Sequence, residues 1–174
     1  MNELELKLSQ IEYFQFVHQN LFISAQPTAE ELLNIKEYGV STILNIALSD
    51  SPNHLDAEDK ICTDLGLSYV QLPLSFDMPS VDQAILILDL IDHLAKQQML
   101  WLHGSNSFKV SSLIYLYRQY YLDMDMPTAL ELLHQIWEPN PTWTGLIHAV
   151  ALQLQGRKAT KELEISLIRT NHFT

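Results

Sequence analysis

The chain has 174 residues, of which 47% are hydrophobic and 18% are charged. That length and apolar content predict one globular domain with a substantial core, and they exclude a disordered chain. Ten Lys and Arg residues against 21 Asp and Glu residues give a net charge of −11. Most of such a surface repels the phosphate backbone of a nucleic acid, so we expect no nucleic-acid partner.

The charge is unevenly distributed along the chain. Residues 156–174 hold four basic and two acidic residues, a net charge of +2, whereas residues 1–155 carry −13. We expect residues 1–155 to form the domain. Residues 156–174 are expected to be a C-terminal tail or terminal helix and not a separate domain.

Cysteine and histidine usage argues against disulfides and metal sites. Cys62 is the single cysteine, and none of the seven histidines stands at a zinc-ligand spacing. The first residues lack the basic and apolar regions of a signal peptide. The most apolar run, residues 84–91, is far shorter than the ~18 residues of a membrane span. We expect a cytoplasmic protein that has no membrane segment, no metal and no cofactor.

Strands and helices are predicted to alternate from the start of the chain. Two short runs, 13–17 and 21–24, flank a polar turn and predict a hairpin. Thr28 and Glu31 have capping-box spacing at the start of a helix that ends before a glycine. The β-branched run 41–47 is typical of a buried parallel strand.

The alternation continues through the second half of the chain. We expect helices over 56–65, 80–97, 109–121 and 143–155, and strands over 67–72 and 99–103. Another helix is predicted from Thr128, which has capping-box spacing with Glu131, to near Trp137. This order predicts an α/β fold with a short, mostly parallel central sheet flanked by helices.

The segment with the most chemical content follows the strand predicted at 99–103. His103 ends that strand, a polar loop follows, and a helix starts near Lys109. Ligands of open α/β sheets bind at the carboxyl ends of strands, and a loop leading into a helix directs backbone N–H groups at an anion. The expected phosphate-binding residues are His103, Gly104, Ser105, Asn106, Ser107, Phe108, Lys109, Val110 and Ser111.

This junction resembles the active-site loop of cysteine-dependent protein phosphatases. It is most similar to the small bacterial branch of the tyrosine and dual-specificity phosphatase superfamily, whose loop runs His-Cys, four residues, then Arg. Residues 24–32, Ser-Ala-Gln-Pro-Thr-Ala-Glu-Glu-Leu, resemble that branch's SxQPxxEEL motif. Residues 39–45 resemble its GVxTVINL strand, and 72–74 resemble its segment before the next helix. The resemblance covers roughly residues 20–148 and implies a three-layer, phosphotyrosine-phosphatase II-like fold.

The resemblance also assigns catalytic positions. In that family a cysteine attacks phosphorus, an arginine grips the phosphate oxygens and an aspartate protonates the leaving group. By position, the nucleophile falls on Gly104 and the arginine on Lys109, while Asp77 stands where the acid could fall. Gly104 has no side chain to attack with, and Lys109 keeps the charge but lacks the bidentate fork. Phosphocysteine chemistry is therefore expected to be absent.

Simpler roles compete for the remaining candidates. Asp77 can be an ordinary loop carboxylate, and His103 can be a strand-end histidine bonded to the backbone. Ser105 lacks the Gly-x-Ser-x-Gly elbow of serine hydrolases and has no identifiable base. Cys62 precedes a predicted strand and cannot be assumed to replace the missing nucleophile.

The sequence thus predicts a catalytically impaired member of the phosphatase family, a pseudophosphatase, that binds phosphate or a phosphorylated ligand weakly at residues 103–111. Two alternatives stay open at this point. One is an active phosphatase or hydrolase with an unrecognised nucleophile. The other is a non-catalytic interaction protein.

Overall fold

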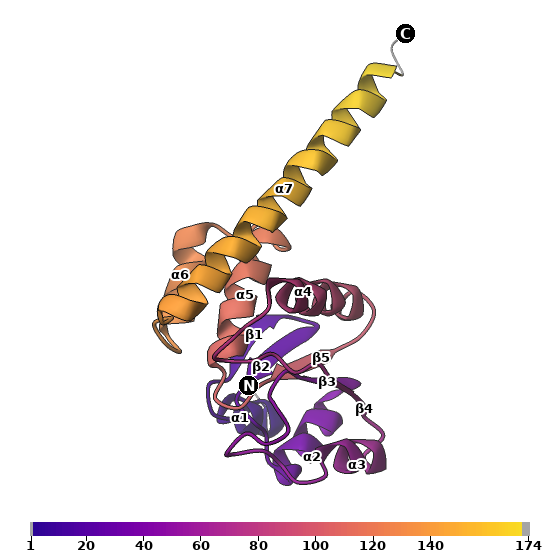
Figure 1. The fold of residues 1–174 in the computed structure, drawn as a ribbon. Helices are drawn as coiled ribbons and strands as arrows, with labels where there is room; N and C mark the ends of the chain where they lie inside the picture. The colour runs from indigo at the N-terminus through magenta and orange to yellow at the C-terminus, as the bar shows by residue number, and fades with distance from the viewer. Residues whose placement is uncertain (1, 172–174) are drawn as a thin grey trace.

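A computed structural model describes residues 2–171 as a five-stranded sheet with seven helices. The strands are β1 (Gln15–His18), β2 (Leu21–Ser24), β3 (Thr42–Asn45), β4 (Ser68–Gln71) and β5 (Leu100–His103). The helices are α1 (Glu3–Ser9), α2 (Ala29–Tyr38), α3 (Glu58–Asp64), α4 (Val81–Ala95), α5 (Phe108–Tyr120), α6 (Met126–His134) and α7 (Pro141–Asn171). The strand order is β1-β2-β5-β3-β4, with β1 antiparallel to β2 and all other neighbours parallel (Figure 1).

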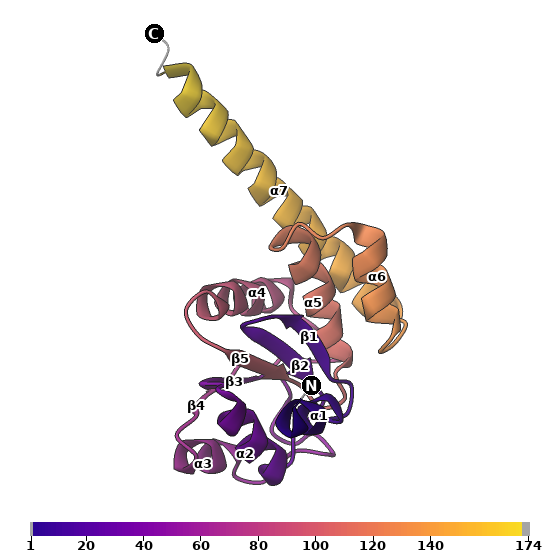
Figure 2. The ribbon, with the colours of Figure 1, turned by 180° about the vertical axis from the view of Figure 1, so that it is seen from behind.

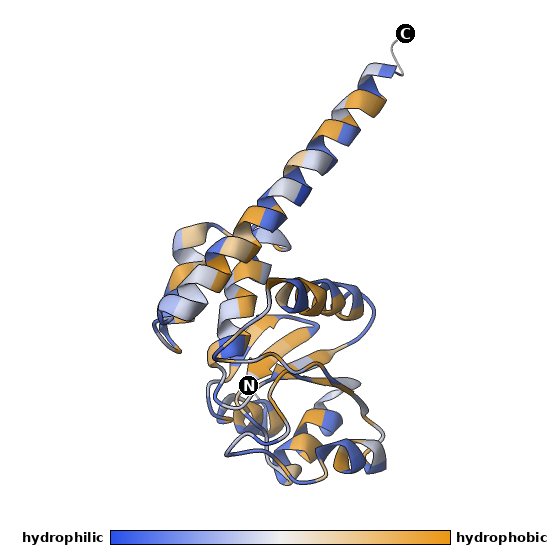
Figure 3. Cartoon of the chain, viewed as in Figure 1, coloured by the Kyte–Doolittle hydropathy of each residue, from blue (hydrophilic) through white to orange (hydrophobic). Residues whose placement is uncertain are grey.

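Helices cover both faces of this sheet. Successive side chains of a strand point to opposite faces, and β5 shows the consequence. Leu100 and Leu102 belong to the core beneath α4, α5, α6 and α7, whereas Trp101 belongs to the core beneath α1, α2 and α3. The two groups of helices lie on opposite sides of the sheet (Figures 1 and 2), and the central strands are strongly hydrophobic (Figure 3). The expected three-layer α/β fold is confirmed.

Local capping chemistry fixes the start and end of α2 as the sequence predicts. The Thr28 hydroxyl accepts the Glu31 N–H at 3.2 Å, and the Glu31 carboxylate accepts the Thr28 N–H at 2.8 Å. Gly39 ends the helix in the left-handed region, with φ +116°, a conformation that costs glycine little. This turn delivers the chain to β3 in the middle of the sheet.

The predicted N-cap of α6 is wrong by three residues. Asp125, not Thr128, is the N-cap, and its carboxylate accepts the Thr128 N–H at 3.0 Å. Pro127 lies in the first turn, where its missing N–H would have no helical acceptor. The helix ends at His134, short of the predicted end near Trp137.

Helix α7 runs without interruption from Pro141 to Asn171 and extends away from the rest of the molecule (Figures 1 and 2). Its first half buries Trp143, Val150 and Leu154, and from residue 155 onward its side chains are exposed. The expected division after residue 155 therefore falls inside one helix, and residues 172–174 lie outside the described part of the chain. No helix within residues 2–171 has both the length and the apolarity needed to cross a membrane.

Candidate functional site

The connection between β5 and α5 lies at the carboxyl edge of the parallel strands. His103 is in register with Ser24 of β2 and with Asn45 of β3, so the three strands end side by side. The next residues, Gly104–Ser107, form a short loop, and α5 begins at Phe108. In open α/β sheets this edge is where ligands bind.

The loop backbone presents a group of unpaired donors. Ser107, the residue before the helix, has φ +69°, in the left-handed region that favours Gly and Asn. The Phe108 N–H donates to the Asn106 side chain at 3.2 Å. Within residues 2–171, no acceptor receives the backbone N–H groups of residues 105, 106, 107, 109 and 110. Unpaired N–H groups at a helix N-terminus are suited to an anion.

The Ser107 side chain adds a further unpaired group. Ser107 is 1% exposed, and its hydroxyl has no hydrogen-bond partner among the described residues. Native proteins leave few buried hydroxyls unpaired, and those that remain commonly mark a ligand, an ion or ordered water. Ser107 therefore gives the loop a second feature, besides the helix N-terminus, that an oxyanion would satisfy.

Gly104 occupies the expected nucleophile position in tight surroundings. A Cβ atom added there would lie 3.3 Å from Cγ2 of Val110 and 3.9 Å from Cγ1 of Ile46. The first distance is shorter than an ordinary van der Waals contact, so Val110 would have to shift slightly. The apolar core thus reaches the place where the family's thiol would stand.

Lys109 is buried, and its ammonium is bonded to main-chain carbonyls. Its side chain is 7% exposed, and its ammonium donates to the main-chain carbonyls of Ile46, at 3.2 Å, and Leu74. The ammonium therefore ties α5 to the segments that follow β3 and β4. Lys109 is one of the residues expected to bind phosphate, and here its ammonium donates to these two carbonyls. Burial lowers the pKa of this amine to about 8.

The burial of Lys109 predicts that stability rises with pH. The pKa is about 8 in the folded chain and 10.5 in the unfolded chain, so between these values the unfolded state binds more protons. From pH 7 to 9.5 the free energy of unfolding should gain about 2 kcal/mol from this group. Urea unfolding of the wild type and of Lys109→Met, which cannot titrate, measures the difference. Equal pH dependence in the two proteins would contradict it.

His103 is buried and contacts both a carboxylate and the loop backbone. Its Nε2 lies 2.6 Å from the Glu58 carboxylate and its Nδ1 lies 3.0 Å from the Gly104 carbonyl. His103 is fully buried and Glu58 is 5% exposed. The backbone contact matches the simpler role considered for His103, but the sequence patterns do not predict the pairing with Glu58.

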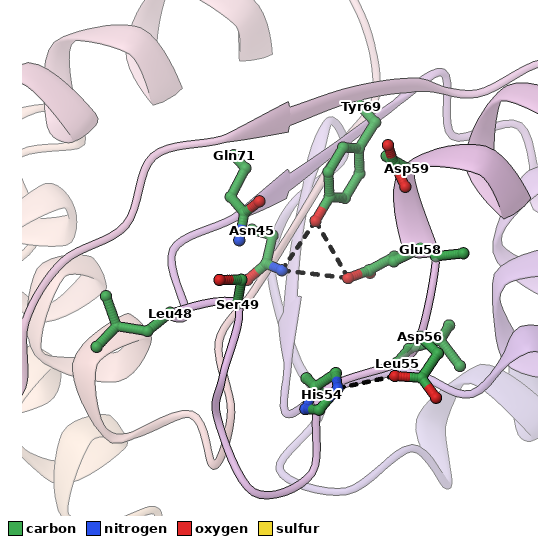
Figure 4. Close-up of a pocket in the computed structure, with 11 residues that line it drawn as sticks. Asn45, Leu48, Ser49, His54, Leu55, Asp56, Glu58, Asp59, Tyr69 and Gln71 are labelled. Carbon is green, nitrogen blue, oxygen red and sulfur yellow. Dashed lines mark hydrogen bonds and ion pairs between the residues drawn. The ribbon is translucent and has the colours of Figure 1, made fainter.

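Glu58 is the centre of a buried polar network. Three side chains donate to its carboxylate: Gln26 at 3.2 Å, Asn45 at 3.1 Å and Tyr69 at 3.3 Å. Figure 4 shows Asn45 and Tyr69 directed at this carboxylate. Burial, the largest cause, raises the Tyr69 pKa well above its usual value. The network joins the ends of β3 and β5 and Tyr69 of β4 to the start of α3, next to the loop.

A cavity of about 510 Å³ opens beside this network. It is lined by Asn45, Leu48, Ser49, His54, Leu55, Asp56, Ala57, Glu58, Asp59, Tyr69 and Gln71 (Figure 4). Its carboxylates outnumber its one histidine, which itself pairs with Asp56 at 2.8 Å. The pKa of His54 is raised, mainly by its hydrogen bond to the Ser51 carbonyl and next by Asp56. Such a lining disfavours an anion, so the cavity is electrostatically distinct from the loop.

The other candidate residues are separated from one another. Asp77 is exposed between β4 and α4, and no hydrogen bond or ion pair within residues 2–171 involves its side chain. The Ser105 hydroxyl donates to the Asn53 side-chain carbonyl, which is not a base. Cys62 is fully buried in the core beneath α1, α2 and α3, and burial raises its pKa to about 12. Neither Ser105 nor Cys62 is placed as an activated nucleophile.

Comparison with known proteins identifies the fold. No protein-family model and no curated protein matches the chain. A DUF442 protein of Shewanella putrefaciens CN-32 superimposes with a TM-score of 0.76 and 21% identity, covering 86% of this chain and 97% of its own. The kinase associated phosphatase KAP, with its catalytic site cysteine changed to serine, gives 0.67 and 12%, over 78% and 87%. The chain has the fold of protein tyrosine phosphatase-like proteins.

A third similar structure contains a phosphorylated ligand. TpbA of P. aeruginosa, in complex with pTyr, superimposes with a TM-score of 0.60 and 15% identity, covering 80% of this chain and 90% of its own. All three structures are matched over most of their length. The phosphatase-like architecture therefore accounts for nearly the whole body of this chain.

Proposed function

We propose that this chain is a phosphatase-family protein without phosphocysteine catalysis, which binds phosphate or a phosphorylated ligand weakly through the loop at residues 104–110. The observation that carries the proposal is the group of unpaired backbone N–H donors at the start of α5, next to a glycine at the nucleophile position. A phosphatase-like neighbour that binds pTyr supports a phosphorylated ligand class.

Backbone donors alone are sufficient for this role. A helix N-terminus contributes on the order of 1 kcal/mol toward an anion when partly exposed, and several N–H groups can share one phosphate. Because the Lys109 ammonium already donates to two carbonyls, we assign the binding to the backbone donors. We therefore expect a dissociation constant in the millimolar range.

An amide-shift titration with inorganic phosphate and with sulfate tests the proposal. We expect shifts clustered at residues 105–111, a dissociation constant of about 1–10 mM, and weaker binding at high salt. Ser105→Asp, which adds a negative charge to the loop, should abolish the shifts. Lys158→Gln in the exposed half of α7 is the matched control and should leave them unchanged. Shifts confined to the basic residues of α7, or none at tens of millimolar, would instead favour a non-catalytic interaction protein.

A further inference from the structure

A second cavity, of about 330 Å³, lies between α1, the start of the sheet and the end of α2. It is lined by Glu5, Leu8, Ser9, Phe14, Phe16, Phe22 and Tyr38. None of these residues belongs to the loop at 103–111 or to the Glu58 network. The volume falls within the range of about 300–1,000 Å³ that is usual for small-molecule sites.

Some aromatic rings of this cavity meet at steep angles, whereas Phe14 and Phe22 stack at 6.5 Å and 22°. The rings of Phe16 and Phe22 lie 5.7 Å apart at 66°, and those of Phe22 and Tyr38 lie 5.5 Å apart at 88°. Phe16 and Tyr38 thus meet Phe22 at steep angles, and all four aromatic residues contribute to the lining. The Phe22 ring is held in place because it stacks on the buried Trp101, with 5.7 Å between the ring centroids and 17° between the ring planes.

The charge of the lining has one sign. Glu5 is its one carboxylate, and no lysine, arginine or histidine is among the lining residues. The Asn2 N–H donates to the Glu5 carboxylate at 2.8 Å, so the carboxylate is held in place by the capping box of α1. The side chain is half-buried, and the chain as a whole carries −11.

We propose that this cavity binds a small quaternary ammonium compound. The faces of aromatic rings attract a cation through their quadrupoles, and methylated ammonium groups suit such a site because they carry charge without N–H donors that need partners. The carboxylate of Glu5 adds direct attraction. An anion would be repelled by Glu5, and a neutral apolar group would gain nothing from either the carboxylate or the quadrupoles.

Choline and its neutral isostere 3,3-dimethyl-1-butanol separate these cases. Both have the same shape, so amide and aromatic shifts of the full-length chain compare charge alone. Choline chloride replaces sodium chloride so that the ionic strength stays constant. We expect millimolar binding of choline at residues that line the cavity, at least about fivefold tighter than the isostere. Equal binding of the two compounds would overturn the proposal. The absence of any shift at about 50 mM choline would overturn it as well.

Two variants test the rings and the carboxylate separately. Phe16 is 58% exposed, so Phe16→Leu should fold and keep an apolar wall while removing one ring. It should weaken choline binding about fivefold and leave the isostere nearly unaffected. Glu5→Gln preserves the capping box, which accepts Gln, and should weaken only choline binding. Glu3→Gln, which removes a neighbouring carboxylate outside the cavity, is the matched control. An equal loss in Glu3→Gln and Glu5→Gln would show a general charge effect and reject the site.

Discussion

Small aryl phosphates should be hydrolysed no faster by the purified protein than by a mock purification. The reason is the absence of any atom at position 104 that could form a bond to phosphorus. Removing the nucleophile of a hydrolase that works by a covalent route costs on the order of 10⁶ in turnover. A Cβ at this position would also be tightly packed, since it would lie 3.3 Å from Cγ2 of Val110.

Two alanine variants provide the control for this prediction. Cys62→Ala and Ser105→Ala remove the thiol and the loop hydroxyl that could otherwise act as a nucleophile. Neither should change the background rate, because the thiol is buried with a raised pKa and the hydroxyl bonds to an amide. Turnover above background that survives both substitutions would contradict an inactive protein and favour a hydrolase with another nucleophile.

The layers of the fold could be predicted because they depend on local rules. Short, continuously apolar runs identify the buried strands, and the spacing of Thr28 and Glu31 identifies the start of α2. Helix α1 was missed although the same rule applies to it. Asn2 and Glu5 form a complete capping box, but the segment is only seven residues long and its apolar stripe is weak.

The interior of the candidate site could not be predicted in the same way. Glu58 meets His103 across 45 positions of sequence, and only the adjacency of β3, β4 and β5 brings them together. A lone glutamate in the first turn of a helix ordinarily suits a solvated position. The Lys109 ammonium donates to the carbonyls of Ile46 and Leu74, whose positions are set by the folded chain. The sequence around Lys109 carries no information about those positions.

Gly104 and Lys109, the positions that the resemblance assigns to the nucleophile and the arginine, are both buried. The space at Gly104 is bounded by core side chains, and the ammonium of Lys109 satisfies carbonyls that link two loops to α5. The buried pair of His103 and Glu58 then supports the loop from beneath. Under the proposed function, the loop backbone binds the anion while these side chains serve the packing of the domain.

An introduced thiol tests whether that backbone is intact. In Gly104→Cys, the unpaired N–H groups and the N-terminus of α5 should stabilise the thiolate and lower the thiol pKa at least one unit below the ordinary value of about 8.5. Alkylation by iodoacetamide as a function of pH measures this value. The wild type supplies a clean baseline, since its single thiol is fully buried and should not react.

Turnover should return only when the phosphate clamp is also supplied. Gly104→Cys with Lys109→Arg restores both groups, and the guanidinium can bind two phosphate oxygens where an ammonium cannot. We expect measurable hydrolysis in the double variant and much less in Gly104→Cys alone. Adding Val110→Ala relieves the 3.3 Å contact of the new Cβ and should increase turnover further if crowding limits the thiol. A folded double variant with an ordinary thiol pKa and no oxyanion binding would show that the loop N–H groups do not converge, and the proposed phosphate site would fail with it.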